Sequence, residues 1–355
     1  MSANLRTFRV HICLLSTTVS VNRIPVFYFG HLFNVLTEHS VPLNDWLNKH
    51  SLSKEKLLQP GANISTEQFD ALVHEVLSKT ELQHLGLLVG KRLQIAHHGA
   101  FGLGILNGKN LRQIIKFVQA YLVIRIPFIE ISTYQEDNEL VILANDVHWQ
   151  GDLHRVMIEA VSMAMFNLFL ALKQSHPDIQ IKRIFFDYAQ PAHHQKYSAF
   201  APLAPEFNHG FSGIAFDIKW AEFILEDTDP MSFQQAKNMC ELEKQQLSQN
   251  MSAAGRVRQL IIANANEYPN LQKVADQLHM SPRTLHRELS KENTSFKDVV
   301  EQFQAKKARE YLLAYGYPVN KVATLLGYSD SANFRRAFRR WYGFAPSDLQ
   351  KQDKL

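Results

Sequence analysis

A repeated pattern of residues in the C-terminal third of the chain leaves little choice of local fold. The first copy, VADQLHMSPRTLHREL, covers Val274–Leu289, and the second, VATLLGYSDSANFRRAF, covers Val322–Phe338. Each copy opens with Val-Ala, continues to a leucine and a turn, and then places two large apolar residues four positions apart. This last spacing is typical of the buried face of a helix. Each copy therefore predicts two short helices joined by a tight turn.

The residues at the two turns support this interpretation. Such a turn needs one residue in the left-handed backbone region, which Gly327 adopts without steric cost in the second copy. His279 occupies the same position in the first copy, where a histidine can adopt that conformation at a penalty. Ser281 and Ser329 are expected to cap the second helix of each copy, with Pro282 as a first helical residue. Both copies thus predict helix-turn-helix units.

The outer face of the second helix in each copy is polar and basic. The residues expected on it are Arg283, Thr284, His286 and Arg287 in the first copy, and Ser331, Asn333, Arg335, Arg336, Arg339 and Arg340 in the second. Arginine hydrogen-bonds guanine edges with two donors, and asparagine or histidine can bond bases or phosphates. Two helical hairpins with solvated charged faces are the alternative, which the repetition disfavours. We expect these side chains to contact DNA.

The charge distribution also indicates a polyanionic partner for this part of the chain. Residues 251–355 carry 17 Lys and Arg against 10 Asp and Glu, a net charge of +7, although the whole chain carries only +4. The first 250 residues therefore carry a net −3. A basic excess confined to one region is typical of a nucleic-acid-binding domain.

The segment between the two copies predicts a long connecting helix. Ser295 can cap a helix that runs to about Tyr315, with Phe296, Val299 and Phe303 among the apolar residues along its inner side. A helix of about 20 residues spans about 30 Å, and major grooves on one face of B-DNA recur about every 34 Å. We expect the two outer helices to enter successive major grooves, over about two turns of DNA.

The segment KVATLLGYSDSANFRRAFRRWYGFAPSDL, Lys321–Leu349, resembles the DNA-binding domain of the AraC/XylS family of bacterial regulators. Gln304 and Gln350 stand where this family usually has Arg, which would remove phosphate contacts, and His279 replaces the usual glycine. The resemblance implies a transcription regulator that binds double-stranded promoter DNA and contacts RNA polymerase.

The preceding part of the chain alternates between helix-like and strand-like patterns. We expect helices at 29–39, 66–79, 111–122 and 152–173, and strands at 129–134, 139–143 and 180–186, with a turn at 136–138. The predicted fold is an α+β N-terminal effector domain followed by an all-α DNA-binding domain with two helix-turn-helix units. The expected boundaries are an N-terminal extension at 1–20, an effector-binding and dimerisation domain at 21–231, a helical linker at 232–252 and the DNA-binding domain at 253–355.

The segment HHGAFGLGILNGKNLRQIIKF, His97–Phe117, is similar to the effector-binding region of one subgroup of the same family. That region differs from the sugar-binding cupin-type domain of the founding regulator. The resemblance implies a small organic effector, such as an amino acid, an aromatic acid or a lipid-like signal, and a homodimer.

Arg125 is the candidate effector-binding residue. It lies within the apolar run Tyr-Leu-Val-Ile-Arg-Ile-Pro-Phe, where a buried arginine needs a partner, and the carboxylate of an anionic effector is one candidate. Pairing with Glu130, or a surface position, is the alternative that we favour. The neighbouring aromatic residues can line an apolar pocket, although such residues more commonly form the core: Phe101, Phe117, Tyr121, Phe128, Trp149, Phe166 and Phe169.

Other site types find little support in the sequence. The pairs His97-His98 and His193-His194 have no carboxylate or Cys at the spacing of a helical zinc site, and no complete phosphate- or dinucleotide-binding loop is present. We expect no cofactor and no metal. Two cysteines suit a reducing cytoplasm, and no apolar run approaches the length of a membrane helix.

Two alternative functions retain the DNA-binding domain. An alkyl-transfer repair enzyme can carry the same twin unit, but it needs an acceptor Cys in a Pro-Cys-His setting, and neither Cys13 nor Cys240 has one. A ligand-free architectural DNA-binding protein is the second alternative. We expect a cytoplasmic, ligand-responsive transcription regulator that is not an enzyme.

Overall fold

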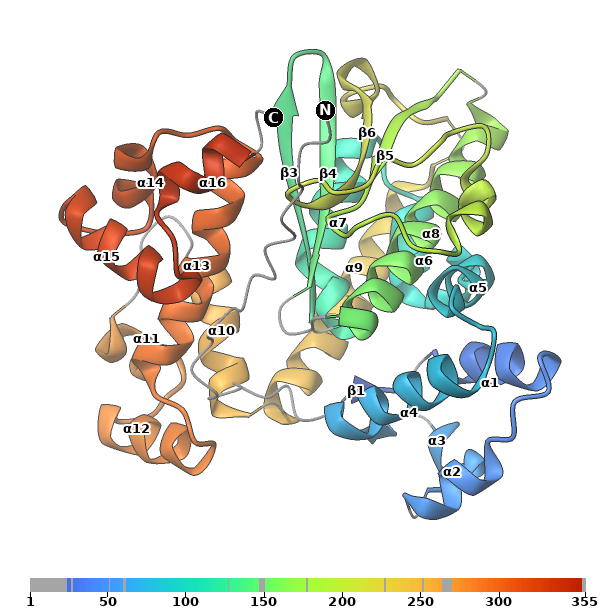
Figure 1. Cartoon of the computed structure of the whole chain (residues 1–355), viewed down its shortest axis with the longest axis horizontal. Coiled ribbons are helices and arrows are strands. Elements are labelled where there is room, and N and C mark those ends of the chain that lie inside the picture. The colour runs from blue at the N-terminus through green and yellow to red at the C-terminus, as the bar shows by residue number, and fades with distance from the viewer. Residues whose placement is uncertain are drawn as a thin grey trace, which may run out of the picture. The chain divides into compact units, whose positions relative to one another are not determined.

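The computed structural model describes residues 24–352, apart from 27, 51, 60–61, 127, 147–150, 177, 227, 251 and 264–269 (Figure 1). The chain divides into two compact units, Val21–Asn250 and Met251–Leu355. The first is an α+β domain, and the second is an all-α domain with two helix-turn-helix units. The predicted extension at 1–20, Cys13 and Trp149 lie outside the described residues.

The first unit combines one main sheet with helices of very different lengths. The helices are α1 (Phe29–Glu38), α2 (Asn44–Lys49), α3 (Lys54–Leu57), α4 (Thr66–Lys79), α5 (Leu85–Arg92), α6 (Ala100–Leu106), α7 (Leu111–Tyr121), α8 (Gly151–Ser175) and α9 (Pro230–Asn250), with short 3-10 helices η1 (Ile95–His98), η2 (Leu122–Ile124), η3 (His194–Phe200) and η4 (Ile218–Ala221). The four helices expected from hydrophobic periodicity are confirmed within two residues at each end. Ser65 begins α4 with a capping box that it forms with Gln68, which explains the sharp start of that helix.

The main sheet is antiparallel, with the strand order β3-β4-β6-β5. Its strands are β3 (Ile129–Glu136), β4 (Glu139–Asp146), β5 (Ile181–Phe185) and β6 (Ser212–Asp217), and a smaller pair joins β1 (Ile24–Pro25) to β2 (Asn63–Ile64). The predicted hairpin is confirmed, and Asp137 takes the left-handed conformation in its turn. Leu140 and Ile142 lie two positions apart on β4, and Ile214 of β6 is paired with Ile142, so these three side chains face one core.

Helix α8 forms the centre of the first unit. It packs on α5 and on β4 of the sheet (Figure 1). Of the described helices it is the one long and apolar enough to cross a membrane, because an 18-residue window within Gly151–Gln174 has a mean hydropathy of 1.6, but 56% of that window is buried inside the domain. Burial of this kind is what a core helix requires, so its length and composition are explained by the fold.

Two glycines allow α5 to approach α8 closely. Gly86 and Gly90 lie one turn apart on α5, and a Cβ at Gly90 would lie 2.6 Å from the Ala160 carbonyl oxygen of α8. Below this contact, the Asn167 side chain of α8 donates hydrogen bonds to the carbonyl oxygens of Gly90, at 3.0 Å, and Leu93, at 3.2 Å. Asn167 therefore adds a side-chain donor at the C-terminal end of α5, where the backbone supplies few donors.

The predicted linker at 232–252 falls in the first unit up to Asn250. Helix α9 covers most of it and packs on α6, α7 and η2. Ala236 and Cys240 are fully buried, and the Lys244 ammonium donates to the Ala120 carbonyl oxygen at 3.1 Å. The sequence indicated a helix here because the segment lacks Gly and Pro, but the few apolar residues that anchor it were too sparse to reveal its packing.

The second unit contains helices alone in its described part. They are α10 (Ala253–Ala263), α11 (Leu271–Gln277), α12 (Pro282–Lys291), α13 (Phe296–Leu313), α14 (Val319–Leu325), α15 (Ser331–Tyr342) and α16 (Pro346–Gln352). Helix α13 contributes to two separate cores. Val299 and Phe303 pack with α10, α11 and α12, whereas Ala308 and Leu312 pack with α14 and α15. Ser295 caps α13 as predicted, and the helix ends at Leu313, two residues before the expected end.

Replacing Gly90 by Ala should destabilise the chain by about 1–3 kcal/mol, because the added methyl group has no space between α5 and α8. Urea unfolding of the full chain measures this loss. Gly30→Ala in α1 is the matched control. Its Cβ would meet the Leu58 side chain at an ordinary 3.6 Å, so we expect no loss, or a gain of up to about 1 kcal/mol. Equal effects of the two substitutions would contradict the close packing of α5 on α8.

Candidate DNA interface and effector cavity

The first helix-turn-helix unit consists of α11 and α12. The turn residue His279 has a φ of 54°, in the left-handed region that the sequence required of it. The Ser281 side chain accepts a hydrogen bond from the Thr284 backbone N–H at 3.1 Å, and Pro282 is the first residue of α12. Leu285 and Leu289 are buried, so the opposite side of α12 faces outward. Each of these sequence predictions is confirmed.

The second helix-turn-helix consists of α14 and α15, and one prediction about it is wrong. Gly327 has the expected left-handed φ of 77°. The cap of α15, however, is Asp330 and not Ser329. The Asp330 carboxylate accepts from the Asn333 N–H at 2.7 Å. The extra residue of the second copy therefore lies before the cap, which makes this turn one residue longer than the first.

Seven of the ten predicted contact residues are exposed on α12 and α15: Arg283, His286, Arg287, Arg335, Arg336, Arg339 and Arg340. The other three are half-buried at the starts of these helices. Thr284 Oγ1 lies 2.8 Å from Ser281 Oγ, and Asn333 Nδ2 lies 2.6 Å from the Asp330 carboxylate. Ser331 is the first residue of α15. In this structure Thr284 and Asn333 reinforce the caps.

The exposed arginines differ in how firmly the protein holds them. Arg340 donates to Glu301 of α13 at 2.9 Å, so this side chain joins the recognition helix to the connecting helix. Arg336 donates to Asn333 Oδ1 of its own helix at 2.5 Å. Arg335 and Arg339 contact no carboxylate among the residues that the structure describes. Arg335 and Arg339 thus remain the more available charges on α15.

Gln304 has a structural position that the sequence did not reveal. Its side-chain amide donates to the Leu326 carbonyl oxygen at 2.8 Å and accepts from the Tyr328 hydroxyl at 3.2 Å. These two residues flank Gly327, so Gln304 fixes the second turn to α13. Both polar atoms of the Gln304 side chain therefore form hydrogen bonds within the protein. The sequence showed only that Gln304 stands where the family usually has an arginine.

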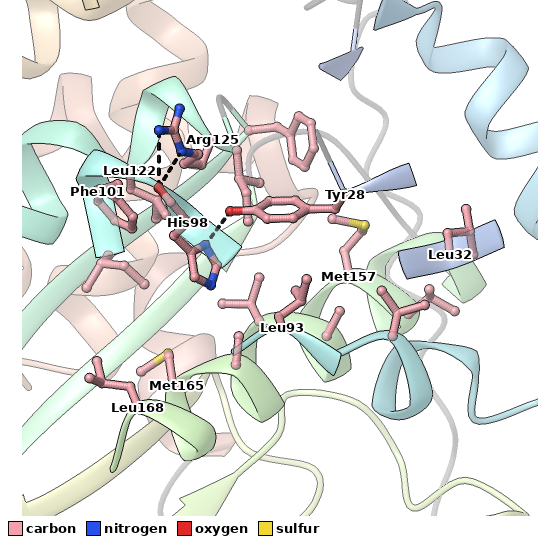
Figure 2. A pocket seen from close by; sticks show the side chains of 18 of the residues that line it. Tyr28, Leu32, Leu93, His98, Phe101, Leu122, Arg125, Met157, Met165 and Leu168 are labelled. Carbon is pink, nitrogen blue, oxygen red and sulfur yellow. Dashed lines mark hydrogen bonds between the residues drawn. The ribbon is translucent and has the colours of Figure 1, made fainter. Parts of the chain in front are cut away.

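A cavity of about 160 Å³ lies inside the first unit. It is lined by side chains of α1, α4, α5, α6, α7 and α8, together with η1, η2 and β3. Its lining is apolar apart from three side chains at one end, Tyr28, His98 and Arg125. Figure 2 shows these three close together around the upper middle of the view, with Met165 and Leu168 at the lower left and Leu32 on the right.

The polar end of the cavity is a connected hydrogen-bond cluster. Tyr28 Oη lies 2.6 Å from His98 Nδ1, and the Arg125 guanidinium donates from Nε and Nη2 to the His98 carbonyl oxygen at 3.3 and 3.2 Å. Burial, with the nearby Arg125 charge, lowers the pKa of His98 to about 4. His98 is therefore neutral at neutral pH. Burial raises the pKa of Tyr28, so its phenol stays protonated.

Arg125 is buried, with only 6% of its side chain exposed. The predicted alternative of a surface position is therefore wrong. Its Nη1 donates to Glu243 Oε2 of α9 at 2.5 Å, and the Glu243 side chain is 38% exposed. A partner 118 positions away in the sequence could not have been inferred from local spacing.

The predicted aromatic residues divide between the cavity and the core. Phe101 and Phe128 line the cavity, whereas Phe117, Tyr121, Phe166 and Phe169 are buried in the surrounding core. Tyr28 and His98 were missed as lining residues. For His98, the adjacent Gly99, which begins α6 at a φ of 58°, marks the unusual backbone that places it there.

The groups that could have supported other chemistry have structural roles. Cys240 is fully buried, and burial raises the pKa of its thiol to about 11, which disfavours the reactive thiolate. His193 Nε2 lies 3.1 Å from the buried Glu159 carboxylate. His97 Nδ1 lies 2.9 Å from the Arg92 carbonyl oxygen. Among the described residues, no group of His, Cys, Asp and Glu could hold a metal ion.

Two family models match this chain. One, described as a helix-turn-helix domain, covers residues 274–352. The other, described as the N-terminal arabinose-binding domain of AraC transcription regulators, covers residues 41–223, more than half of the chain. The chain belongs to the AraC family of transcription regulators. It is thus a DNA-binding regulator with two helix-turn-helix units and an N-terminal domain of the arabinose-binding type.

Full-length relatives share both domains of this AraC-family regulator. The ornithine utilization regulator of Pseudomonas aeruginosa is 27% identical over 328 residues, which cover 92% of this chain and 96% of that protein. The regulator VqsM of the same organism is 24% identical, over 89% of this chain and 99% of that protein. The crystal structure of CdpR from Pseudomonas aeruginosa is 18% identical, covers 92% of this chain and 98% of that one, and superimposes with a TM-score of 0.42.

Substitutions at the two turn residues should have opposite effects on stability. His279→Gly removes a side chain from a left-handed position and should stabilise the DNA-binding domain by up to about 1 kcal/mol. Gly327→Ala forces a side chain into the same conformation and should destabilise it by about 1 kcal/mol or more. Thermal unfolding of the full-length variants provides the comparison. A loss of stability in His279→Gly would mean that the imidazole itself stabilises the turn.

Proposed function

We propose that this regulator binds promoter DNA through α12 and α15 in successive major grooves, and that a small organic effector in the cavity controls this binding. The observation that carries the proposal is an apolar cavity with one polar end inside the domain that precedes the twin unit. Cavities with this combination of apolar walls and few polar groups are typical ligand sites.

The exposed residues of the two recognition helices have the chemistry for this DNA contact. On α12, Arg283, His286 and Arg287 share one outward face, and we propose that they select the base sequence. On α15, Arg335, Arg336 and Arg339 supply more charge, which suits phosphate contact. Neutralising phosphates releases counterions, so the affinity for DNA should fall steeply as salt rises. Thr284, Ser331, Asn333 and Arg340 border these faces and complete the proposed contact set.

The cavity favours a small apolar effector over a polar one. An apolar protein cavity of about 150 Å³ accommodates benzene, which sets the scale for a cavity of about 160 Å³ here. A sugar would leave several hydroxyl groups facing apolar side chains, and unpaired buried polar groups are costly. The carboxylate of ornithine could pair with Arg125, but its two ammonium groups would find no carboxylate in the described lining. Neither the name of the family domain nor that of the ornithine regulator therefore describes the effector of this chain.

Two further properties remain predictions. A homodimer would place two twin units on one promoter, and light scattering of the purified protein measures its mass directly. Contact with RNA polymerase would make the protein an activator, which an in vitro transcription assay on a bound promoter tests.

Filling the cavity tests the effector proposal. Ala164 lies on its wall, and Ala164→Phe would occupy much of the space. We expect the variant to bind DNA without any response to the metabolites that change DNA affinity in the wild type. The ligand-free alternative predicts that no metabolite extract shifts the DNA affinity or the melting temperature of either protein.

Replacing single arginines should distinguish residues that select the base sequence from residues that contact phosphates and from residues that stabilise the fold. Arg287→Ala should weaken binding to the preferred site by about 1–3 kcal/mol and relax the base preference at one position. Arg339→Ala should weaken binding to all sequences alike and reduce the salt dependence. Arg340→Ala, at the border of the contact set, should weaken DNA binding less than either and should mainly lower stability, because Arg340 is paired with Glu301. Titrations with specific and scrambled DNA distinguish these outcomes. A uniform loss in Arg287→Ala would assign that residue to phosphate contact.

A further inference from the structure

We infer that the effector is a small apolar carboxylate, and that its carboxylate group takes the place of Glu243 on Arg125. This inference rests on the proposed function, because it assigns a chemical class and a regulatory step to the same cavity. It follows from three properties of the polar end of the cavity: its charge, the unequal burial of the Arg125–Glu243 pair, and the helix from which Glu243 comes.

The cavity lining carries a positive charge at one residue, Arg125. Of the described side chains that line it, Arg125 alone is a strong base, and no Asp or Glu is among them. His98 is neutral, since its pKa lies near 4, and Tyr28 presents a phenol. A ligand with one carboxylate can pair with Arg125 at this end and place its hydrocarbon part toward Met165 and Leu168 (Figure 2). A positive ligand would find no counter-charge in the lining.

The ion pair that now holds Arg125 is unequally buried. Arg125 is 6% exposed and needs an anionic partner, because an unpaired buried charge is strongly unfavourable. Glu243 is 38% exposed, so its carboxylate can turn to water at a much smaller penalty. The two hydrogen bonds from Arg125 to the His98 carbonyl oxygen keep the guanidinium at the cavity during such an exchange. A ligand carboxylate can therefore replace Glu243 without leaving Arg125 unpaired.

Glu243 also connects the cavity to the helix that precedes the DNA-binding unit. It lies on α9, which ends at Asn250, and α10 begins at Ala253. The neighbouring contacts of α9 are Glu241, which accepts from the Tyr121 hydroxyl at 3.1 Å, and Lys244, which donates to the Ala120 carbonyl oxygen. Of these three contacts of α9, only the Arg125–Glu243 pair involves a residue that lines the cavity, and the release of Glu243 breaks this pair. Effector binding and the Arg125–Glu243 pair then exclude each other, so the effector weakens the attachment of α9.

Matched acids and amides test the charge requirement without any substitution. Calorimetry of the full-length protein compares hexanoate with hexanamide and benzoate with benzamide, which differ in charge but little in shape. We expect each acid to bind at least about tenfold more tightly than its amide, as a buried charge-assisted hydrogen bond requires. Equal affinities would overturn the inference and leave the apolar cavity proposal standing. Binding of neither pair, nor of benzene, would contradict both.

Three variants test the exchange. Glu243→Gln removes the competing carboxylate, so hexanoate should bind about tenfold more tightly, while hexanamide changes less than twofold. Arg125→Met should abolish the preference for the acid. Glu241→Gln is the control on the same helix, and it should bind both compounds as the wild type does, because Glu241 pairs with Tyr121.

The regulatory step has its own measurement. On a DNA fragment that the protein selects from random sequence, hexanoate and Glu243→Gln should change the affinity of the chain for DNA in the same direction, and hexanamide should not change it. Unchanged hexanoate affinity in a folded Glu243→Gln variant would overturn the exchange. An unchanged DNA affinity would overturn the role of α9.

Discussion

The DNA-binding unit depends on the packing of one helix into two cores. Along α13, Val299 and Phe303 belong to the core of the first helix-turn-helix, and Ala308 and Leu312 belong to the core of the second. Because a single helix serves both, neither recognition helix can shift without disturbing its own core. The 18 residues of α13 correspond to about 27 Å at a rise of about 1.5 Å per residue. The helix is thus a rigid spacer of nearly one turn of DNA.

Polar contacts between elements then fix the second turn and its recognition helix. Gln304 of α13 holds the Leu326 carbonyl oxygen beside Gly327, and Glu301 of α13 accepts from Arg340 of α15. Both contacts begin on the same helix. Helix α13 therefore positions the second helix-turn-helix through side-chain hydrogen bonds as well as through apolar packing. Arg335 and Arg339 are exposed on α15.

In the first unit, the walls of the cavity differ in how closely their elements pack. The close approach of α5 to α8 through Gly86 and Gly90, with Asn167 at its end, makes one wall rigid. The remaining walls come from shorter elements that meet at Tyr28, His98 and Arg125. Glu243 of α9, which does not line the cavity, pairs with Arg125 and neutralises its charge. Glu243 thus ties this corner to α9, which ends at Asn250, shortly before α10 begins at Ala253.

Local features of this fold could be predicted from the sequence, and long-range features could not. The twin units, the left-handed His279 and the cap at Ser281 follow from spacing and backbone preferences of adjacent residues. The Asp330 cap was missed because the extra residue of the second copy could be placed on either side of it. Strand β6, with Gly213 as its second residue, and the glycine-rich α5 and α6 lack a clear periodicity, since close packing replaces large side chains there. The Arg125–Glu243 pair depends on the complete fold.

Hydroxyl-radical footprinting of the full-length protein on a selected DNA site tests the role of α13 most directly. A rigid spacer between two recognition helices predicts two protected backbone segments on one face of the DNA, about 10 base pairs apart. Each segment should lose protection separately when the exposed residues of α12 or of α15 are replaced by alanine. A single protected segment, or one that disappears as a whole with either set of substitutions, would contradict the account.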